Sequence, residues 1–177
     1  MPRIPGITIF VAVLSFLAIG GWLISPNIDR REPPPVEIRI DPPTKAILRN
    51  TTTLVVEVTN RGDHAIEDLG VKINRGYSNA LMVIQTIPGS NIDDATNEKR
   101  VYFGVLKANE TKNYRILMSP QRAGTFALTV RVVAAQRGFG PVQLTDLKTG
   151  MSEFTSQTEV IDPRVTTPEA NPAPPKP

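Results

Sequence analysis

The stretch TFALTVRVVA, Thr125 to Ala134, decides the fold of this chain. Every second residue from Phe126 to Val132 is apolar. Successive side chains of an extended strand point to opposite faces, so these residues share one face. The stretch therefore predicts a β-strand with one buried face and one exposed face.

The same period of two recurs throughout the region between Val36 and Ile161, and helical spacing is nowhere sustained. Further strands are predicted at Val36–Ile40, Leu54–Val58, Leu69–Ile73, Leu81–Ile87, Val101–Leu106, Lys112–Met118 and Phe154–Ile161. Turn residues such as Asn60-Arg61-Gly62-Asp63 and Pro88-Gly89-Ser90 separate them. About seven or eight short strands predict an all-β fold, an antiparallel β-sandwich. Parallel pairing is not expected, because no crossover helices are visible.

The segment Ile4–Ile24 carries no charged residue, and at about 1.5 Å per residue it is long enough for a hydrocarbon core of about 30 Å. Trp22 lies near one end, and Pro26 follows the segment. We expect one N-terminal transmembrane helix over residues 4–25. Its membrane-anchoring residues would include Ile4, Phe10, Phe16, Trp22 and Ile24. A secretory signal cleaved near Ala18-Ile19-Gly20 is the alternative, although the apolar run continues past that point.

The remaining chain divides by composition. Residues 1–3 form a short cytoplasmic end, 26–35 a proline-rich linker, 36–163 the sandwich and 164–177 a proline-rich tail. Flanking charges do not settle the orientation, since Arg3 lies on one side and Arg30-Arg31 on the other. Because a large domain can cross regardless of flanking charge, we expect the sandwich on the periplasmic side of a bacterial inner membrane.

The composition of the 177 residues excludes several kinds of functional site. There is no cysteine and only one histidine, which excludes disulfides, thiolate sites and multi-histidine metal clusters. The 20 basic and 17 acidic residues are too evenly balanced to indicate a nucleic-acid partner. We expect no catalysis, no cofactor, no metal and no small-molecule substrate.

Two stretches together carry a family resemblance: LVVEVTNRG at Leu54–Gly62 and GVLKANETKNYRILMSPQRAGTFALTVRVVA at Gly104–Ala134. Their strand ending in Asn-x-Gly and their later Ala-Gly-Thr strand resemble the bacterial cell-adhesion-related (CARDB-like) group of immunoglobulin-like domains. The resemblance implies a stalk, spacer or interaction module outside the cytoplasm. The chain departs from that pattern at Ala108-Asn109, where a glycine is usual, and in the long segment Gln136–Glu153.

Three other motifs have simpler explanations. Arg61-Gly62-Asp63 matches the integrin-recognition tripeptide, but turns favour these residues anyway. The oxygen-bearing residues between Asn91 and Glu98 lack the order of a calcium loop, so a solvated acidic loop is favoured. His64 lies beside Asp63, yet no motif places a nucleophile for it.

Charge is unevenly distributed along the sandwich. Val36–Glu98 carries six basic and nine acidic residues, whereas Lys99–Lys148 carries nine basic and two acidic residues. The basic residues of interest are Lys99, Arg100, Lys107, Lys112, Arg115, Arg122, Arg131 and Arg137. If they share a sheet, they form a basic face for acidic lipid headgroups or an acidic subunit. Alternatively, the acidic half balances them in space.

The segment Gln136–Glu153 is long for a sandwich connection, and Phe139 lies in it between glycines and a proline. Phe139 either anchors a protein partner or folds back over the open end of the sandwich. We take Phe139, Arg137, Arg131, Arg115 and Arg122 as candidate partner-contact residues.

These features favour a single-pass membrane protein that acts as an accessory or scaffold subunit of a larger bacterial membrane complex, respiratory or photosynthetic. Its expected partners are the lipid bilayer and other subunits. The alternative is an adhesion or envelope-spacing module that binds polysaccharide or a cell-surface partner. Three tyrosines and one tryptophan leave little for sugar stacking.

Overall fold

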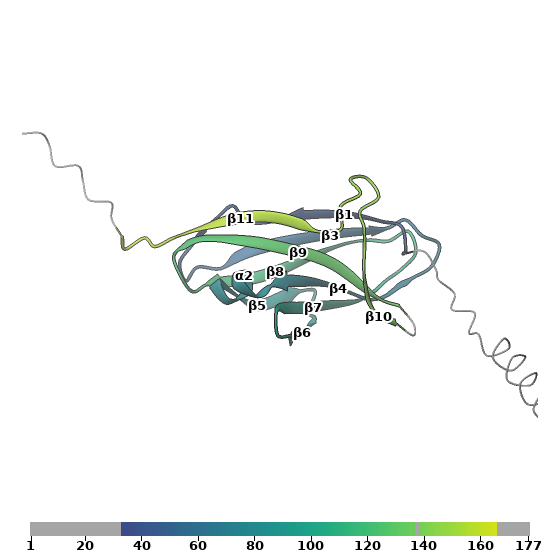
Figure 1. The fold of residues 1–177 in the computed structure, drawn as a ribbon, viewed down its shortest axis with the longest axis horizontal. Helices are drawn as coiled ribbons and strands as arrows, with labels where there is room; N and C mark the ends of the chain where they lie inside the picture. The colour runs from purple at the N-terminus through teal and green to yellow at the C-terminus, as the bar shows by residue number, and fades with distance from the viewer. Residues whose placement is uncertain (1–32, 137–138, 166–177) are drawn as a thin grey trace, which may run out of the picture. The chain divides into compact units, whose positions relative to one another are not determined.

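The computed structural model describes residues 33–136 and 139–165, which form a sandwich of two β-sheets (Figure 1). One sheet has four strands, all paired antiparallel. Its order is β1 (Val36–Asp41), β3 (Thr52–Asn60), β8 (Thr111–Pro120) and β5 (Leu81–Ile87).

The second sheet has seven strands. Its order is β2 (Lys45–Ile47), β11 (Phe154–Ile161), β9 (Gly124–Gln136), β4 (Ile66–Asn74), β7 (Glu98–Leu106) and β6 (Asn91–Asp94). The seventh strand, β10 (Phe139–Gln143), pairs with the C-terminal end of β9. The long strand β9 therefore has β11 along its first half and β10 along its last residues.

The predicted all-β sandwich is confirmed, and each of the eight expected strands is present. The sequence did not predict β2, β6, β10 or the short helix α2 (Arg75–Ala80). Helix α2 follows β4 directly and leads from the seven-stranded to the four-stranded sheet. Its six residues are fewer than two helical turns, too few to show a helical period. The strand β6 is exposed at all four positions, so it carries no alternation to detect.

The expectation that all pairing is antiparallel is wrong at one edge, where β2 and β11 pair in parallel over three residues. A crossover helix is the usual connection between two parallel strands that follow one another in the chain. Here nearly the whole domain connects Ile47 to Phe154, so no local crossover is needed. The hydroxyl of Thr158 also donates a hydrogen bond to the carbonyl oxygen of Pro43, just before β2.

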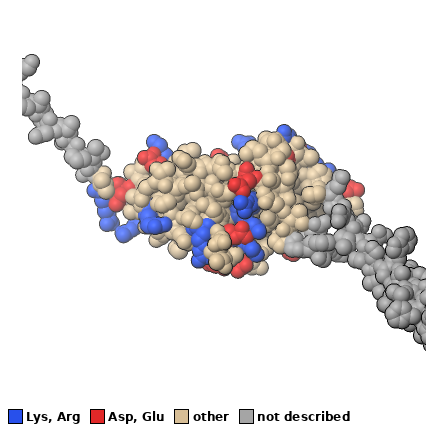
Figure 2. Space-filling model, in the orientation of Figure 1, with Lys and Arg blue, Asp and Glu red and all other residues tan. Residues whose placement is uncertain are grey.

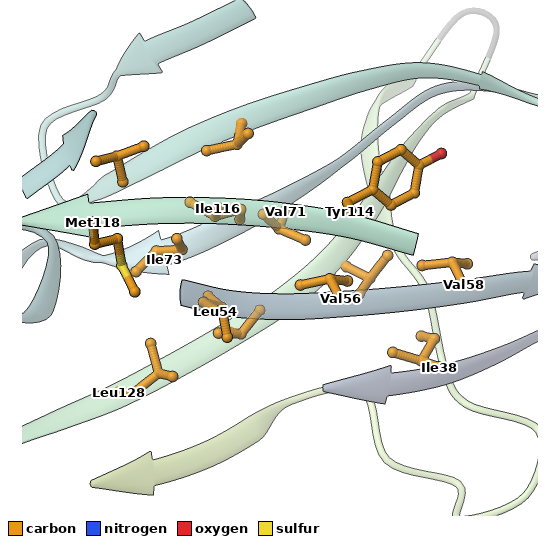
Figure 3. Packing of buried hydrophobic residues seen from close by; sticks show 14 of the residues in the cluster. Ile38, Leu54, Val56, Val58, Val71, Ile73, Tyr114, Ile116, Met118 and Leu128 are labelled. Carbon is orange, nitrogen blue, oxygen red and sulfur yellow. The ribbon is translucent and has the colours of Figure 1, made fainter. Parts of the chain in front are cut away.

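The apolar faces of the two sheets meet in one core (Figure 3). Leu54, Val56 and Val58 of β3 are fully buried. On the opposite sheet, the predicted face of β9 is buried from Leu128 to Val132, while Phe126 is partly buried at its end. The described residues include no disulfide, so burial of apolar area supplies the main stabilising term.

The predicted membrane segment and its anchoring residues lie outside the described residues, as does the C-terminal tail from residue 166. Within residues 33–136 and 139–165, no helix has the length and apolar character to cross a membrane. The anchor therefore stays a prediction from the sequence.

Candidate interaction surface

The candidate basic residues do not share one sheet. Arg115 lies on β8 in the four-stranded sheet, whereas Arg131 lies on β9 in the seven-stranded sheet. Arg122 lies in the loop between these strands, with its guanidinium carbon 5.8 Å from the centre of the Phe126 ring. The condition for a single basic face, that these residues share one sheet, is not met, because the chain passes from one sheet to the other between β8 and β9.

The other two candidate contact residues lie next to the gap in the described chain. Arg137 falls outside the described residues. Phe139 is the first residue of β10, and only its backbone is described; it pairs with Gln136. Their contact with a partner stays a prediction.

On the seven-stranded sheet, four basic side chains, Lys72, Lys99, Arg100 and Arg131, form ion pairs with neighbouring carboxylates. The register places Arg100, Lys72 and Arg131 in one cross-strand row, which would be repulsive alone. Glu98 lies 3.0 Å from the Lys72 ammonium and 2.9 Å from the Arg100 guanidinium, and Glu153 lies 2.6 Å from Arg131. Burial acts to raise the pKa of Glu98, but its bonds to Lys72 and Arg100 bring it below its ordinary value.

The alternative in which the acidic half balances the basic half therefore describes this sheet. Figure 2 shows Lys and Arg next to Asp and Glu on the visible face, separated by broad areas without charge. Asp94 of the expected acidic loop belongs to β6 and pairs with Lys99 at 3.1 Å. Within the described chain, no group of three or more potential metal-binding side chains is present.

The outer face of the four-stranded sheet is different. Its charged side chains include Arg39 and Asp41 on β1, Glu57 on β3 and Arg115 on β8. Among residues 33–136 and 139–165, the structure shows no ion pair for any of these four. An open hollow lies between them, lined by Arg39, Asp41, Val55, Glu57 and Asn113.

Beside this hollow, the edge strand β5 presents apolar side chains to solvent. Met82, Ile84 and Ile87 are 46%, 47% and 47% exposed, and Ile87 is the register partner of Arg115. We call Met82, Ile84, Ile87 and Arg115 the interaction strip. A contiguous apolar area rimmed by polar residues is typical of a protein-contact site.

The sequence predicts Arg115 as one of five candidate contact residues, but it does not single out the three apolar residues of the strip. The run Leu81–Ile87 is predicted only as a strand. The signal that could have shown them is that both the odd-numbered and the even-numbered residues from 81 to 84 are apolar. In the structure, Leu81 and Val83 face the core, while Met82 and Ile84 face outward. A strand with one solvated face would ordinarily carry polar residues there.

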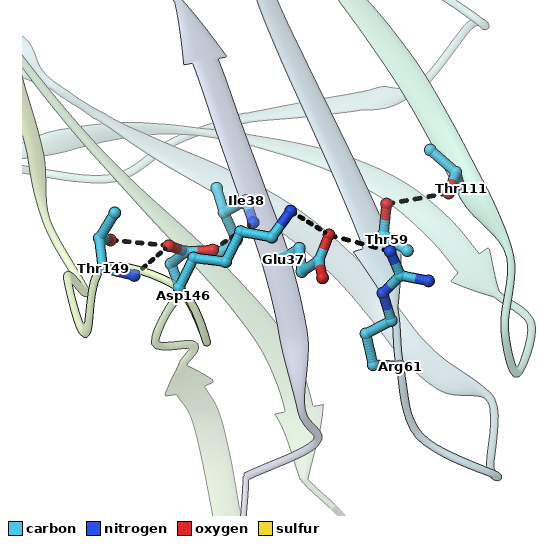
Figure 4. Close-up of polar contacts among 8 residues, drawn as sticks. Glu37, Ile38, Thr59, Arg61, Thr111, Asp146 and Thr149 are labelled. Atoms are coloured by element: carbon cyan, nitrogen blue, oxygen red, sulfur yellow. Dashed lines mark hydrogen bonds and ion pairs between the residues drawn. The ribbon is translucent and has the colours of Figure 1, made fainter.

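The long segment before β11 folds back onto the domain (Figure 4). The carboxylate of Asp146 is 2% exposed and accepts a 2.7 Å hydrogen bond from the backbone N–H of Ile38 on β1. It also accepts bonds from the N–H and hydroxyl of Thr149. Leu147 N–H donates to the carbonyl oxygen of Val36. Residues 144–151 thus cover the outer edge of β1, and we call them the β1 latch.

An ion-pair bridge fastens the latch further. Glu37 lies 2.9 Å from Lys148 in the latch and 3.0 Å from Arg61 at the end of β3 (Figure 4). The hydrogen bond from Arg61, together with that from Lys148, lowers the pKa of Glu37. Arg61 of the Arg-Gly-Asp tripeptide is therefore engaged in holding β1, which agrees with its interpretation as a structural turn.

Asn60 explains the Asn-x-Gly turn. Its buried amide donates to the carbonyl oxygens of His64 at 2.8 Å and Lys107 at 3.0 Å, and its side-chain oxygen accepts from Gly62 N–H. The amide thereby ties the β3–β4 turn to the β7–β8 turn. His64 itself is exposed and contacts the Asp63 carboxylate. Its surroundings are those of a surface turn.

Two of the three tyrosines are buried. Tyr77 shares a hydrogen bond with Thr158 at 2.8 Å, and Tyr114 stacks on Phe103 with ring centres 3.9 Å apart. Burial, with a smaller contribution from nearby Glu110, raises the pKa of Tyr114 to about 12. These rings are unavailable for sugar stacking, which weakens the polysaccharide alternative.

No protein-family model and no curated protein matches the sequence. Among solved structures, a cohesin module from a Clostridium perfringens family 33 glycoside hydrolase is 6% identical, with a TM-score of 0.53 over 73% of this chain and 98% of that chain. A CARDB domain from Pyrococcus furiosus is 16% identical, with a TM-score of 0.45 over 73% and 90%. The cohesin likeness shows the β-sandwich fold alone.

Proposed function

We propose that this chain is a non-enzymatic interaction module, tethered to a bacterial membrane by its N-terminal segment, that serves as an accessory subunit of a larger membrane complex. One observation carries the proposal: the interaction strip leaves Met82, Ile84 and Ile87 about half exposed beside Arg115, which forms no ion pair within residues 33–136 and 139–165. The predicted apolar segment Ile4–Ile24 supports the tether.

The distribution of polar chemistry supports the same conclusion. The side chains of Asp146 and Asn60 form hydrogen bonds within the domain, where they hold the latch and the turns in place. Within the described residues, Lys72, Lys99, Arg100 and Arg131 of the seven-stranded sheet pair with nearby carboxylates, whereas the outer face of the four-stranded sheet combines charges without an ion pair with exposed apolar side chains. Such a mixture is suited to a protein partner, because apolar contact supplies affinity and charge supplies register.

The test is purification of the full chain, under mild conditions, from its native membrane. We expect a stoichiometric companion protein that is lost when Ile87 is changed to Asp. A charge in the centre of an apolar contact must be desolvated on binding, so the companion's affinity should fall by about tenfold or more.

Val105→Asp is the matched control, because Val105 is β-branched, lies on β7 of the other sheet and is 50% exposed, close to the 47% of Ile87. It should retain the companion. Absence of any companion, or equal loss in both variants, would contradict the proposal.

A further inference from the structure

The strand β5 is the less protected of the two edges of the four-stranded sheet. Within the part of the chain that the structure describes, β5 has a hydrogen-bonded neighbour on one side only, which is β8. Its other side presents unpaired backbone groups, the usual template for pairing with another chain. The exposed side chains of Met82, Ile84 and Ile87 lie along it.

The edge strands β1, β2 and β6 each carry a protective feature. The β1 latch covers β1 through Asp146 and Leu147. The edge strand β2 is only three residues long and includes Lys45, and β6 ends in Asp93 and Asp94. Short length, charge and coverage by a loop are the recognised ways of blocking edge-to-edge pairing.

In contrast, β5 has seven residues and no charge, and the whole stretch from Tyr77 to Ile92 is uncharged. A strand added to this edge must therefore be extended and uncharged, and must place apolar side chains on the outer face. The sequence of β5 itself meets these requirements.

The exposure pattern of β5 is also symmetric. From Met82 to Ile87 it reads exposed, buried, exposed, exposed, buried, exposed, which is the same in both directions. The cause is the irregularity between Val83 and Gln85, where one residue is inserted relative to β8. The inserted residue shifts the alternation of exposed and buried positions by one. The pattern is therefore symmetric about the centre of the segment Met82–Ile87.

This symmetry allows antiparallel self-pairing about a two-fold axis. With the axis between Ile84 and Gln85, exposed Met82 lies opposite exposed Ile87 of a second copy. Buried Val83 then lies opposite buried Thr86. Residues directly opposite in an antiparallel pair point to the same face, so both faces match without a register conflict.

We propose that two copies of this chain pair through β5 and join their four-stranded sheets into one continuous sheet. The proposal rests on the proposed interaction function: the second copy pairs with the backbone edge of β5, and the companion subunit contacts the outer face of the interaction strip. Since no charged residue lies between Tyr77 and Ile92, two-fold pairing brings no like charges opposite each other. The apolar pair of Met82 and Ile87 supplies the contact on the outer face.

The absence of cysteine from the chain makes a direct test possible. Two differently tagged full-length copies, one Met82→Cys and one Ile87→Cys, are co-expressed, and the native membranes are treated with a mild oxidant. Opposite residues of an antiparallel pair have Cα atoms about 4.5–5.5 Å apart, within the range of a disulfide. We expect a disulfide-linked dimer that carries both tags.

Each single variant alone is an internal control, because two copies of position 82 would be about 17 Å apart along the paired strands. Ile87→Cys co-expressed with Val105→Cys, on the other sheet, measures random collision. The co-expressed Met82→Cys and Ile87→Cys copies, the mixed pair, should yield about ten times more disulfide-linked dimer than either control. Only this pair brings the two cysteines within disulfide distance. An equal yield from the Val105→Cys control overturns the proposal.

A second pair of variants separates self-pairing from misfolding. Gln85→Lys alone and Gln85→Glu alone each place two like charges beside the two-fold axis and should lower the yield of the Met82–Ile87 disulfide by about two- to fivefold. Co-expression of the two should restore it, because opposite charges then meet at the axis.

The outcomes distinguish the two proposals. If the mixed pair gives no dimer but Ile87→Cys forms an adduct with a different protein, self-pairing is overturned and the interaction function stands. If neither a dimer nor an adduct forms, both are overturned.

Discussion

Replacing Asp146 with alanine tests whether one carboxylate holds the β1 latch. The side chain accepts bonds from Ile38 N–H at 2.7 Å, Thr149 N–H at 2.8 Å and the Thr149 hydroxyl at 2.7 Å. Ile38 is buried, so its amide loses its acceptor without gaining water. Thr149 is exposed, so its groups can turn to solvent. The cost therefore falls mainly on the bond to Ile38.

The magnitude follows from these three bonds. A hydrogen bond to a charged group contributes about 1.5–3 kcal/mol, and an orphaned buried amide costs about 1–3 kcal/mol. We expect Asp146→Ala to lower the free energy of unfolding by about 2–4 kcal/mol. In Asp146→Asn the amide oxygen still accepts from Ile38, but the NH2 group that replaces Oδ2 accepts neither bond from Thr149. We therefore expect Asp146→Asn to lower the free energy of unfolding by about 1–2 kcal/mol.

The assay is denaturant unfolding of the full-length chain in detergent, followed by circular dichroism, with hydrogen exchange of the Ile38 amide. Asp41→Ala is the control, because Asp41 lies on the same strand, is exposed and forms no ion pair within residues 33–136 and 139–165. It should change stability by less than about 0.5 kcal/mol. Equal midpoints for the two variants, or an Ile38 amide still protected in Asp146→Ala, would refute the latch.

The pH dependence gives a further check on Asp146. Burial acts to raise the pKa of its carboxyl, but the hydrogen bonds from Thr149 and from the backbone of Ile38 bring it below its ordinary value of 3.8. Because its pKa is lowered, the folded state binds fewer protons at Asp146 than the unfolded state does. The contribution of the Asp146 carboxylate to the free energy of unfolding is therefore fully present above the unfolded pKa. It is lost as the pH falls through the folded pKa. The difference between Asp146→Ala and the parent chain should be full at neutral pH and shrink below about pH 4.

Three other substitutions test the core and the turns in the same unfolding assay. Tyr114→Phe should stabilise by about 1 kcal/mol, because the buried hydroxyl has no hydrogen-bond partner among the described residues. Since burial raises the pKa of Tyr114 to about 12, the parent chain should also lose stability between about pH 10 and 12, and the Phe variant should lose less. Gly70→Ala should cost about 1–3 kcal/mol, because its Cβ would lie 2.7 Å from the carbonyl oxygen of Val101. Asn109 has a φ of 56°, so Asn109→Ala should destabilise by about 1 kcal/mol, whereas Asn109→Gly should not.

Strands with one buried face were predictable from the sequence. The expected ranges Leu81–Ile87 and Phe154–Ile161 are those of β5 and β11, and β9 extends its expected range by a few residues. The strand β6 was not predictable, because all of its positions are exposed. Its pairing with β7, rather than its own pattern, makes it a strand.

The candidate site was predictable only in part. Arg115 was selected as one of several basic residues, but nothing local separates it from Arg131. The separation comes from neighbours distant in sequence: Glu153 pairs with Arg131, whereas Ile87 lies beside Arg115. Exposure of Met82 and Ile84 likewise depends on the edge position of β5.

The sequence by itself determined that this domain is a cysteine-free β-sandwich, because the alternation of apolar residues sets which side of each strand is buried. Only the tertiary structure decided which sheet edges are covered. The latch reaches β1 across about a hundred residues, through the carboxylate of Asp146, while β5 is left open. Strand periodicity is a local property of the chain, whereas edge coverage depends on which distant segments meet when the sheets close.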